Sequence, residues 1–179
     1  GFNTVTLPDH FTDQPAPLIG LTAAAVATTT LRVLPLVLAN DYREPMVLAK
    51  ELASIDALSG GRLEFGLGAG WMITDYEQAG IRYDSPGMRI RRLSESVDIL
   101  RALLAGDEVT IDSEFYSITG SLSAPLPVQA GGIPLMLAGG KQKMLTLAGE
   151  KADIVGFNPG LTAGVIDERA GRTATAEKT

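Results

Sequence analysis

Five short runs of mostly apolar residues divide the sequence, and each ends at a turn-forming or glycine-rich segment. The runs cover residues 5–7, 31–38, 63–67, 134–138 and 153–157. Because apolar residues do not alternate with polar ones in these runs, they are typical of strands buried on both faces. The pattern therefore predicts a parallel sheet that is covered by helices.

The segments between these runs have helical periodicity. Four helices are predicted, over residues 17–30, 45–58, 89–105 and 144–150. In the clearest of them, over residues 45–58, one apolar stripe is formed by Leu48, Leu52, Ile55 and Leu58. In the helix over residues 89–105, the stripe is formed by Leu93, Val97, Leu100 and Leu104. Such stripes are expected to face the core.

The predicted strands and helices alternate along the chain, as βα units do. Residues 109–111 and 115–118 interrupt this order as a small predicted hairpin. Two architectures fit the alternation, a (β/α)8 barrel and an open doubly wound sheet. The tail, residues 161–179, has a weak pattern and is expected to be a loop or insertion segment that is disordered in part.

Composition restricts the chemistry more than the fold. The 179 residues include no cysteine and one histidine, and their formal net charge is −6 at pH 7. These counts exclude disulfides, thiolate metal sites, a cysteine nucleophile and a multi-histidine zinc site. The acidic balance argues against nucleic acid as a partner. Polar or turn-forming residues interrupt the long apolar stretches, so we expect no membrane partner and a cytoplasmic location.

His10 is the one imidazole in the sequence, and it follows Asp9 at the carboxyl end of the first predicted strand. In parallel α/β folds, functional sites are built at that end of the sheet. A lone histidine is more often structural than catalytic, but this position favours a functional role. Imidazole also exchanges protons near neutral pH. His10 is therefore our candidate acid or base.

Glycine-rich segments follow two other predicted strands. Residues 66–71 do not match the dinucleotide fingerprint, because Trp71 stands where G-x-G-x-x-G requires its third glycine. These glycines either permit tight packing or let a planar ligand approach the backbone. Residues 139–141 precede a helix, whose first N–H groups can hold a phosphate, or they form a plain turn. Leu135 and Gln142 exclude a Walker A loop there.

Three arginines, Arg89, Arg91 and Arg92, lie at the start of the helix that follows the first glycine segment. A guanidinium in that turn can bind a cofactor phosphate with two hydrogen bonds. The other interpretation is a solvated helix face. Periodicity does not decide which arginine faces the glycine segment, and we take Arg91 as the candidate.

Five segments of the sequence, in order over nearly its whole length, resemble the luciferase-like monooxygenase superfamily. They are residues 7–11, 34–40, 48–71, 127–140 and 152–159. The stretch Leu-Ser-Gly-Gly-Arg-Leu and the Gly-x-Gly-x-Gly-Trp that follows it are the most specific. Within the superfamily, the sequence is most similar to actinobacterial oxidoreductases that use the deazaflavin coenzyme F420.

The resemblance implies a (β/α)8 TIM barrel of the luciferase-like type. It assigns residues 5–9, 32–39, 63–68, 134–138 and 153–157 to barrel strands 2 to 6, with the hairpin as an insertion. Barrel strands 1, 7 and 8 have no counterpart, so about five βα units of the roughly 250-residue barrel are represented. We expect residues 1–160 to form a single partial-barrel domain of a longer protein, with a rearranged partial barrel as the alternative.

The resemblance also implies a site at the carboxyl ends of barrel strands 2 to 6, where the cofactor ring lies in the superfamily. It implies that His10 is the catalytic acid or base and that Asp9 orients it. The implied cofactor-binding residues are Ala39, Asn40, Gly68, Ala69, Gly70, Gly139 and Gly140, the last two through the phosphate. A non-proline cis peptide is implied at Ala39-Asn40, and no metal is implied.

The predicted function is hydride transfer between F420 and an unidentified organic substrate. One alternative is an FMN-dependent two-component monooxygenase, and another is a noncatalytic flavin-binding relative. Sugar-phosphate dehydrogenases of the family carry glutamate where Trp71 stands and tryptophan where Gln14 stands, which argues against sugar-phosphate oxidation. The absence of a strand-4 cysteine argues against light emission. The expected partners are a small-molecule substrate, a flavin or F420 reductase, and a second copy of the chain in a homodimer.

Overall fold

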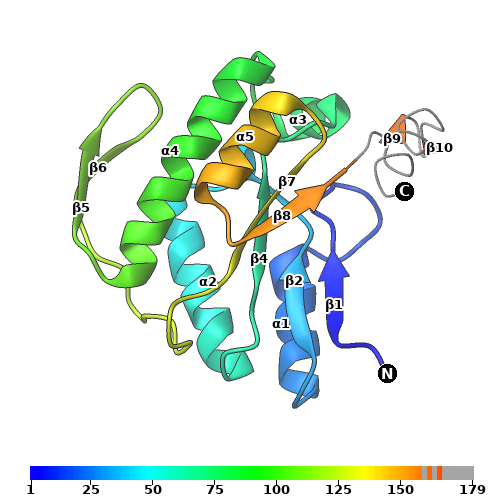
Figure 1. The fold of residues 1–179 in the computed structure, drawn as a ribbon, viewed down its shortest axis with the longest axis vertical. Coiled ribbons are helices and arrows are strands. Elements are labelled where there is room, and N and C mark those ends of the chain that lie inside the picture. The colour runs from blue at the N-terminus through cyan, green and yellow to red at the C-terminus, as the bar shows by residue number, and fades with distance from the viewer. Residues whose placement is uncertain (159–160, 163–164, 167–179) are drawn as a thin grey trace.

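Six parallel strands form the sheet of this computed structural model, which describes residues 1–158, 161–162 and 165–166. The strands are β1 (Thr4–Leu7), β2 (Arg32–Pro35), β3 (Leu38–Ala39), β4 (Phe65–Gly68), β7 (Leu135–Gly139) and β8 (Ile154–Phe157). β1 pairs with β2, and β3, β4, β7 and β8 pair in that order. A parallel bridge between Val33 and Leu63 joins the two groups. Neighbouring strands therefore follow chain order without a reversal (Figure 1).

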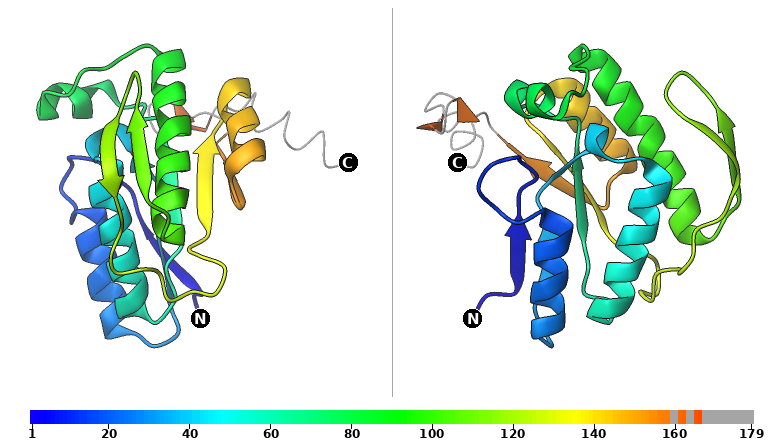
Figure 2. Two further views of the ribbon diagram at one scale, coloured as in Figure 1. Left: turned by 90° about the vertical axis from the view of Figure 1, so that its left-hand side faces the viewer. Right: turned by 180° about the vertical axis from the view of Figure 1, so that it is seen from behind.

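A continuous layer of helices packs against these strands (Figure 2). Its members are α1 (Pro17–Ala27), α2 (Pro45–Ser59), α4 (Pro86–Ala105) and α5 (Gln142–Lys151). α1 contacts α2, α2 contacts α4, and α4 contacts α5. A doubly wound sheet instead reverses its strand order and carries helices on both faces. Of the two predicted architectures, the structure therefore adopts the barrel type, as a partial (β/α) barrel.

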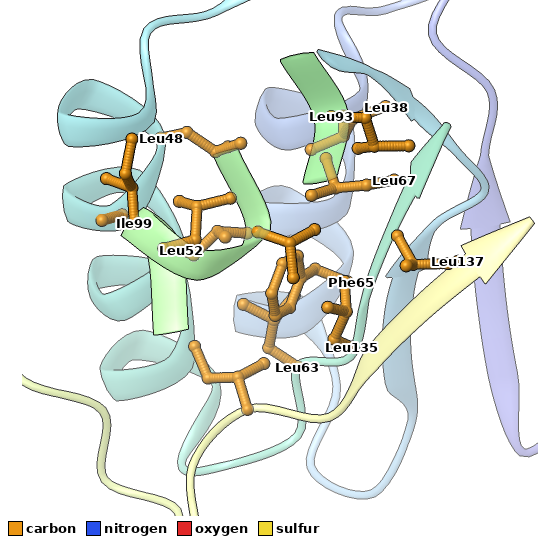
Figure 3. Packing of buried hydrophobic residues seen from close by; sticks show 14 of the residues in the cluster. Leu38, Leu48, Leu52, Leu63, Phe65, Leu67, Leu93, Ile99, Leu135 and Leu137 are labelled. Carbon is orange, nitrogen blue, oxygen red and sulfur yellow. The ribbon is translucent and has the colours of Figure 1, made fainter. Parts of the chain in front are cut away.

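The hydrophobic core lies between the strands and this helical layer. Leu63, Phe65 and Leu67 alternate along the β4 segment and are at most 1% exposed. Their side chains meet those of Leu52 on α2 and Leu93 on α4, both fully buried (Figure 3). Alternate residues of a strand point to the same face, so one face of β4 packs entirely against the core. The opposite face of β4 carries Gly66 and Gly68.

The apolar run that precedes Asn40 differs from its prediction. The expected single strand over residues 32–39 is divided into β2 and β3, and the non-proline cis peptide joins Leu36 to Val37. Its predicted position at Ala39-Asn40 is therefore wrong. Val37 packs directly onto β4, because a Cβ added to Gly66 would lie 2.7 Å from Val37 Cγ1. Tight strand packing thus explains the glycine at position 66.

The predicted helix over residues 45–58 is confirmed as α2, which ends at Gly60 in the left-handed conformation. Two stripe positions differ from the prediction, because Leu58 is 61% exposed and Leu104 is half-buried. Two short elements were not predicted, the 3-10 helix η1 (Asn40–Tyr42) and α3 (Ile73–Ala79). α1, α4 and α5 correspond to the other three predicted helices within a few residues.

The predicted hairpin is present as β5 (Val109–Asp112) and β6 (Ser117–Ser121), which lie outside α4 (Figure 1). In the tail, β9 (Leu161–Thr162) and β10 (Val165–Ile166) pair antiparallel. The rest of the predicted loop or insertion segment over residues 161–179 lies outside the described residues. In the part of the chain that the structure describes, no helix has both the length and the apolarity needed to cross a membrane.

Candidate active site at the carboxyl ends of the strands

The loops that follow the parallel strands meet at one edge of the sheet. They carry Asp9 and His10 after β1, Asn40 after β3, Trp71 after β4 and residues 140–141 after β7. Because all these strand pairs are parallel, their carboxyl ends lie on the same side. The predicted site residues Asp9, His10, Asn40 and Gly140 therefore lie at one edge, although they are distant in sequence.

His10 is held by a carboxylate that the sequence pattern does not single out. Its Nδ1 lies 2.6 Å from Oδ2 of Asp75, the third residue of α3. The Asp75 side chain is 3% exposed, whereas that of His10 is 23% exposed. A carboxylate oxygen accepts a hydrogen bond, so we assign the proton of the neutral ring to Nδ1. Nε2 is then the ring nitrogen that can exchange a proton with a ligand.

Asp9 has a structural role that differs from its prediction. Its Oδ2 accepts from the Ala39 backbone N–H at 3.0 Å and from Arg43 Nη1 at 2.6 Å. Its Oδ1 accepts from Arg43 Nη2 at 3.1 Å, which completes a bidentate ion pair. Asp9 thus fastens the end of β1 to the end of β3 and to the chain after η1. The residue that orients His10 is Asp75, and the prediction of Asp9 for that role is wrong.

Asn40 turns its side chain toward the β5–β6 hairpin. Its Nδ2 lies 3.2 Å from the hydroxyl oxygen of Tyr116, and the residue is 2% exposed. Among the described residues, Asn40 Oδ1 is buried without a hydrogen-bond partner. Ala39 is also buried and contributes its N–H to Asp9. Binding of a cofactor by Ala39 and Asn40 stays a prediction.

Contacts within the protein shape the glycine segment after β4. A Cβ added to Gly68 would lie 2.9 Å from Val37 Cγ2, and one added to Gly70 would lie 1.8 Å from the Tyr76 hydroxyl oxygen. Gly70 also has a φ of 73°, in the left-handed region that disfavours side chains. Packing therefore explains both glycines. Contact of a cofactor with residues 68–70 stays a prediction.

Arg89, in the first turn of α4, fastens the glycine segment to that helix. Its Nε and Nη2 donate to the carbonyl oxygens of Ala69 and Gly70 at 3.0 and 3.3 Å. Its Nη1 donates to the carbonyl oxygen of Asp84. The residue is 5% exposed, and its guanidinium carbon lies 4.0 Å from the ring centroid of Tyr83. The guanidinium is therefore engaged by the protein itself.

Arg91 points away from that segment. Its Nη2 lies 3.2 Å from both carboxylate oxygens of Glu114 in the hairpin, and both side chains are more than half exposed. Residues that are two positions apart in a helix are rotated by about 200° around its axis, so Arg89 and Arg91 occupy nearly opposite faces of α4. Arg89, not Arg91, thus lies beside the glycine segment, and binding of a cofactor phosphate by Arg91 stays a prediction.

Replacing Arg89 by alanine is expected to lower the free energy of unfolding by about 1.5–3 kcal/mol, because buried carbonyl oxygens lose a charged donor. Arg91→Ala is the matched control, and it is expected to change that free energy by less than about 0.5 kcal/mol, since its ion pair is exposed. Urea unfolding followed by circular dichroism measures both. Equal losses in the two variants would contradict the fastening role of Arg89.

Two tyrosines form a second layer behind His10. The Tyr42 hydroxyl donates to Asp75 Oδ2 at 3.4 Å, and the Tyr76 hydroxyl donates to Asp41 Oδ2 at 3.1 Å. Burial raises the pKa of both phenols, and the adjacent carboxylates raise the two pKa values further. Both hydroxyls therefore stay protonated as donors over the ordinary pH range. In this cluster, the imidazole is therefore the side chain left to exchange a proton with a ligand.

The segment after β7 leads directly into α5. The N-cap residue of α5, Lys141, makes no side-chain capping hydrogen bond. Gly139 packs on Met144, because an added Cβ would lie 2.4 Å from Met144 Cγ. Gly140 is exposed. An uncapped helix start with free N–H groups is chemically suited to a phosphate, so the predicted role of Gly139 and Gly140 is compatible with their surroundings.

Asp75 is the main functional candidate that the sequence did not reveal. It lies in α3, which has seven residues and is too short to produce a recognisable apolar stripe. Its partner His10 is 65 positions away in sequence. The one available signal was an acidic residue shortly after the glycine segment, which by itself has many explanations.

The fold and the sequence assign the chain to a known family. It belongs to the luciferase-like monooxygenase family, because the sequence profile of that family matches residues 1–177. The 5,10-methylenetetrahydromethanopterin reductase of Archaeoglobus fulgidus is 33% identical over 158 residues, which are 88% of this chain and 45% of that protein. The F420-dependent glucose-6-phosphate dehydrogenase of Mycobacterium avium is 31% identical over 163 residues, which are 86% of this chain and 48% of that protein.

A solved structure has the same fold. The F420-dependent secondary alcohol dehydrogenase in complex with an F420-acetone adduct superposes with a TM-score of 0.79 at 23% identity, over 98% of this chain and 57% of that chain. The resemblance to the luciferase-like family and the partial-barrel fold are thus confirmed. The chain spans about half the length of the curated relatives it matches.

Proposed function

We propose that this chain supplies the acid–base pair and part of the cofactor site of an F420-dependent oxidoreductase that acts on an organic substrate. The observation that carries the proposal is the His10–Asp75 pair, which lies where the parallel strands end. The F420-dependent enzymes among its relatives support the choice of cofactor. The rest of the barrel would complete the site.

The residues present are chemically suited to such a cofactor. F420 carries a deazaflavin ring and a phosphate, and the uncapped start of α5 beside Gly139 and Gly140 offers backbone donors for the phosphate. When bound, the deazaflavin supplies or accepts the hydride. The residues of this chain would hold the phosphate and bring the substrate close to His10.

His10 would then exchange a proton with the substrate through Nε2. Asp75 fixes the ring orientation through Nδ1, and Tyr42 donates a second hydrogen bond to the same carboxylate oxygen. A buried carboxylate of this kind holds one tautomer in place and stabilises the protonated ring. Asp75 and Tyr42 are positioning residues in this scheme, and His10 is the catalytic residue.

The second candidate function is an FMN-dependent two-component monooxygenase. Membership in the luciferase-like monooxygenase family favours it. It would use the same fold and the same histidine, with reduced flavin from a partner reductase and with oxygen as co-substrate. Turnover in air with reduced FMN, and none under anaerobic conditions with reduced F420, would support this alternative.

Titration of the protein with F420 and with FMN tests the proposal. We expect F420 to bind at least tenfold more tightly than FMN. In addition, Gly140→Asp places a negative charge at the start of α5 and is expected to weaken F420 binding on the order of tenfold. Gly149→Asp adds the same charge near the other end of α5, where no atom lies within 4 Å of the added Cβ, and should leave binding unchanged.

Three outcomes would contradict the proposal in whole or in part. Preferential binding of FMN would favour the monooxygenase, and failure to bind either flavin would remove the cofactor from the scheme. Equal effects of Gly140→Asp and Gly149→Asp would show that the phosphate is not held at the start of α5.

A further inference from the structure

Two large aromatic side chains are exposed beside His10. Trp71 is 64% exposed, and its ring lies edge-on to the His10 ring with 5.7 Å between centroids. Phe11 is 51% exposed, and its ring centroid lies 5.2 Å from that of Tyr42. Tyr42 in turn donates to Asp75, the partner of His10. Trp71 therefore contacts the one imidazole of the chain, and Phe11, the neighbour of that histidine in sequence, is connected to it through Tyr42 and Asp75.

The backbone that carries Trp71 is firmly held. The Trp71 carbonyl oxygen accepts from the Tyr83 hydroxyl at 3.1 Å, and the preceding carbonyl of Gly70 accepts from Arg89. Single exposed apolar residues are common on protein surfaces. Here, one exposed aromatic ring contacts a partly exposed histidine, and a second belongs to the next residue in the chain, so that together they offer an apolar surface. Planar apolar groups gain most from such a surface, through burial and ring stacking.

The charges around this surface disfavour an anionic ligand. Asp75 places a buried carboxylate directly behind His10. The nearby arginines are already engaged, since Arg43 pairs with Asp9 and Arg89 donates to backbone carbonyls. Arg92 is held by Asp41 and Asp84. A ligand carboxylate or phosphate would therefore lose hydration near His10 without gaining a free cation from these side chains.

We propose that Trp71 and Phe11 form an aromatic wall that binds an uncharged, planar aromatic part of the substrate against His10. This inference rests on the proposed function and defines the substrate class of that site. Trp71 and Phe11 would act as specificity-determining residues, since they contact the substrate without exchanging protons.

The chain contains one tryptophan, so its intrinsic fluorescence reports directly on the wall. The test uses two probes of nearly equal shape, uncharged 2-acetonaphthone and anionic 2-naphthoate, without any cofactor. We expect 2-acetonaphthone to quench Trp71 emission and to bind at least tenfold more tightly than 2-naphthoate in equilibrium dialysis. Phe11→Ala is expected to weaken binding of 2-acetonaphthone about three- to tenfold.

Phe2→Ala is the matched control, because Phe2 is 96% exposed and the substitution removes the same ring. It should leave binding of both probes unchanged, and equal thermal melting of the two variants would exclude a difference in folding. Equal affinity for the two probes, or equal effects of Phe2→Ala and Phe11→Ala, would overturn the inference. Binding of F420 without binding of 2-acetonaphthone would overturn the aromatic wall and leave the proposed function intact.

Discussion

Replacing His10 by alanine is expected to lower turnover about 10²- to 10⁴-fold, which is the usual contribution of a positioned general acid or base. Cofactor affinity should not change, because the proposed phosphate contacts lie at the start of α5. The measurement is the rate at which reduced F420 is oxidised under anaerobic conditions, together with a separate titration of F420 binding. Exogenous imidazole should restore part of the rate, since it can enter the space that the side chain leaves.

Substitutions of Asp75 test the positioning role in the same assay. Asp75→Ala should lower kcat with little change in KM, because it releases the ring without removing it. Asp75→Glu retains the carboxylate and should retain more of the rate. Unchanged turnover in His10→Ala would eliminate the histidine as the acid or base. A lowered rate that imidazole does not restore would indicate a structural role instead.

Replacing Gly70 by alanine is expected to lower the free energy of unfolding by about 2–5 kcal/mol, the sum of left-handed backbone strain and overpacking. The φ of Gly70 is 73°, and an added Cβ would lie 1.8 Å from the Tyr76 hydroxyl oxygen. Tyr76 would have to move away from Asp41, and it directly follows Asp75 in α3. We therefore expect His10-dependent turnover to fall together with stability.

Gly80→Ala is the matched control for this substitution. Gly80 has a φ of 67°, but no atom lies within 4 Å of its added Cβ. Its loss should thus be limited to the backbone strain, about 1–2 kcal/mol. Urea unfolding of both variants separates the two contributions. Equal losses of unfolding free energy would mean that Tyr76 can move aside without destabilising the protein. Glycine would then be needed at position 70 only for its left-handed backbone conformation.

Much of the fold could be predicted because its signals are local. The predicted helix over residues 45–58 became α2 (Pro45–Ser59), since proline at the first position, helical periodicity and the glycine after it all act within the segment. The buried strands were recognised from their apolar runs. The choice between barrel and doubly wound sheet required the family resemblance, because strand order is a long-range property.

The errors in the site have long-range or geometric causes. Asp9 is next to His10 in sequence, but its carboxylate faces Arg43, whereas the partner of the imidazole is Asp75. Likewise, Arg89 and Arg91 are only two positions apart in α4. Because their positions on the helix are rotated by about 200°, only one of the two arginines can point toward the glycine segment.

The hydrogen bonds that Arg43 and Arg89 make behind the site affect how its substrate specificity can evolve. Arg43 holds the loop after β1 and Arg89 holds the loop after β4, each through groups other than the outward-facing rings of Phe11 and Trp71. Substitutions at exposed positions typically change stability by about 0.5 kcal/mol or less. The two ring positions can therefore diverge between descendants of this chain while the loops keep their shape, so that a new substrate preference requires few mutational steps.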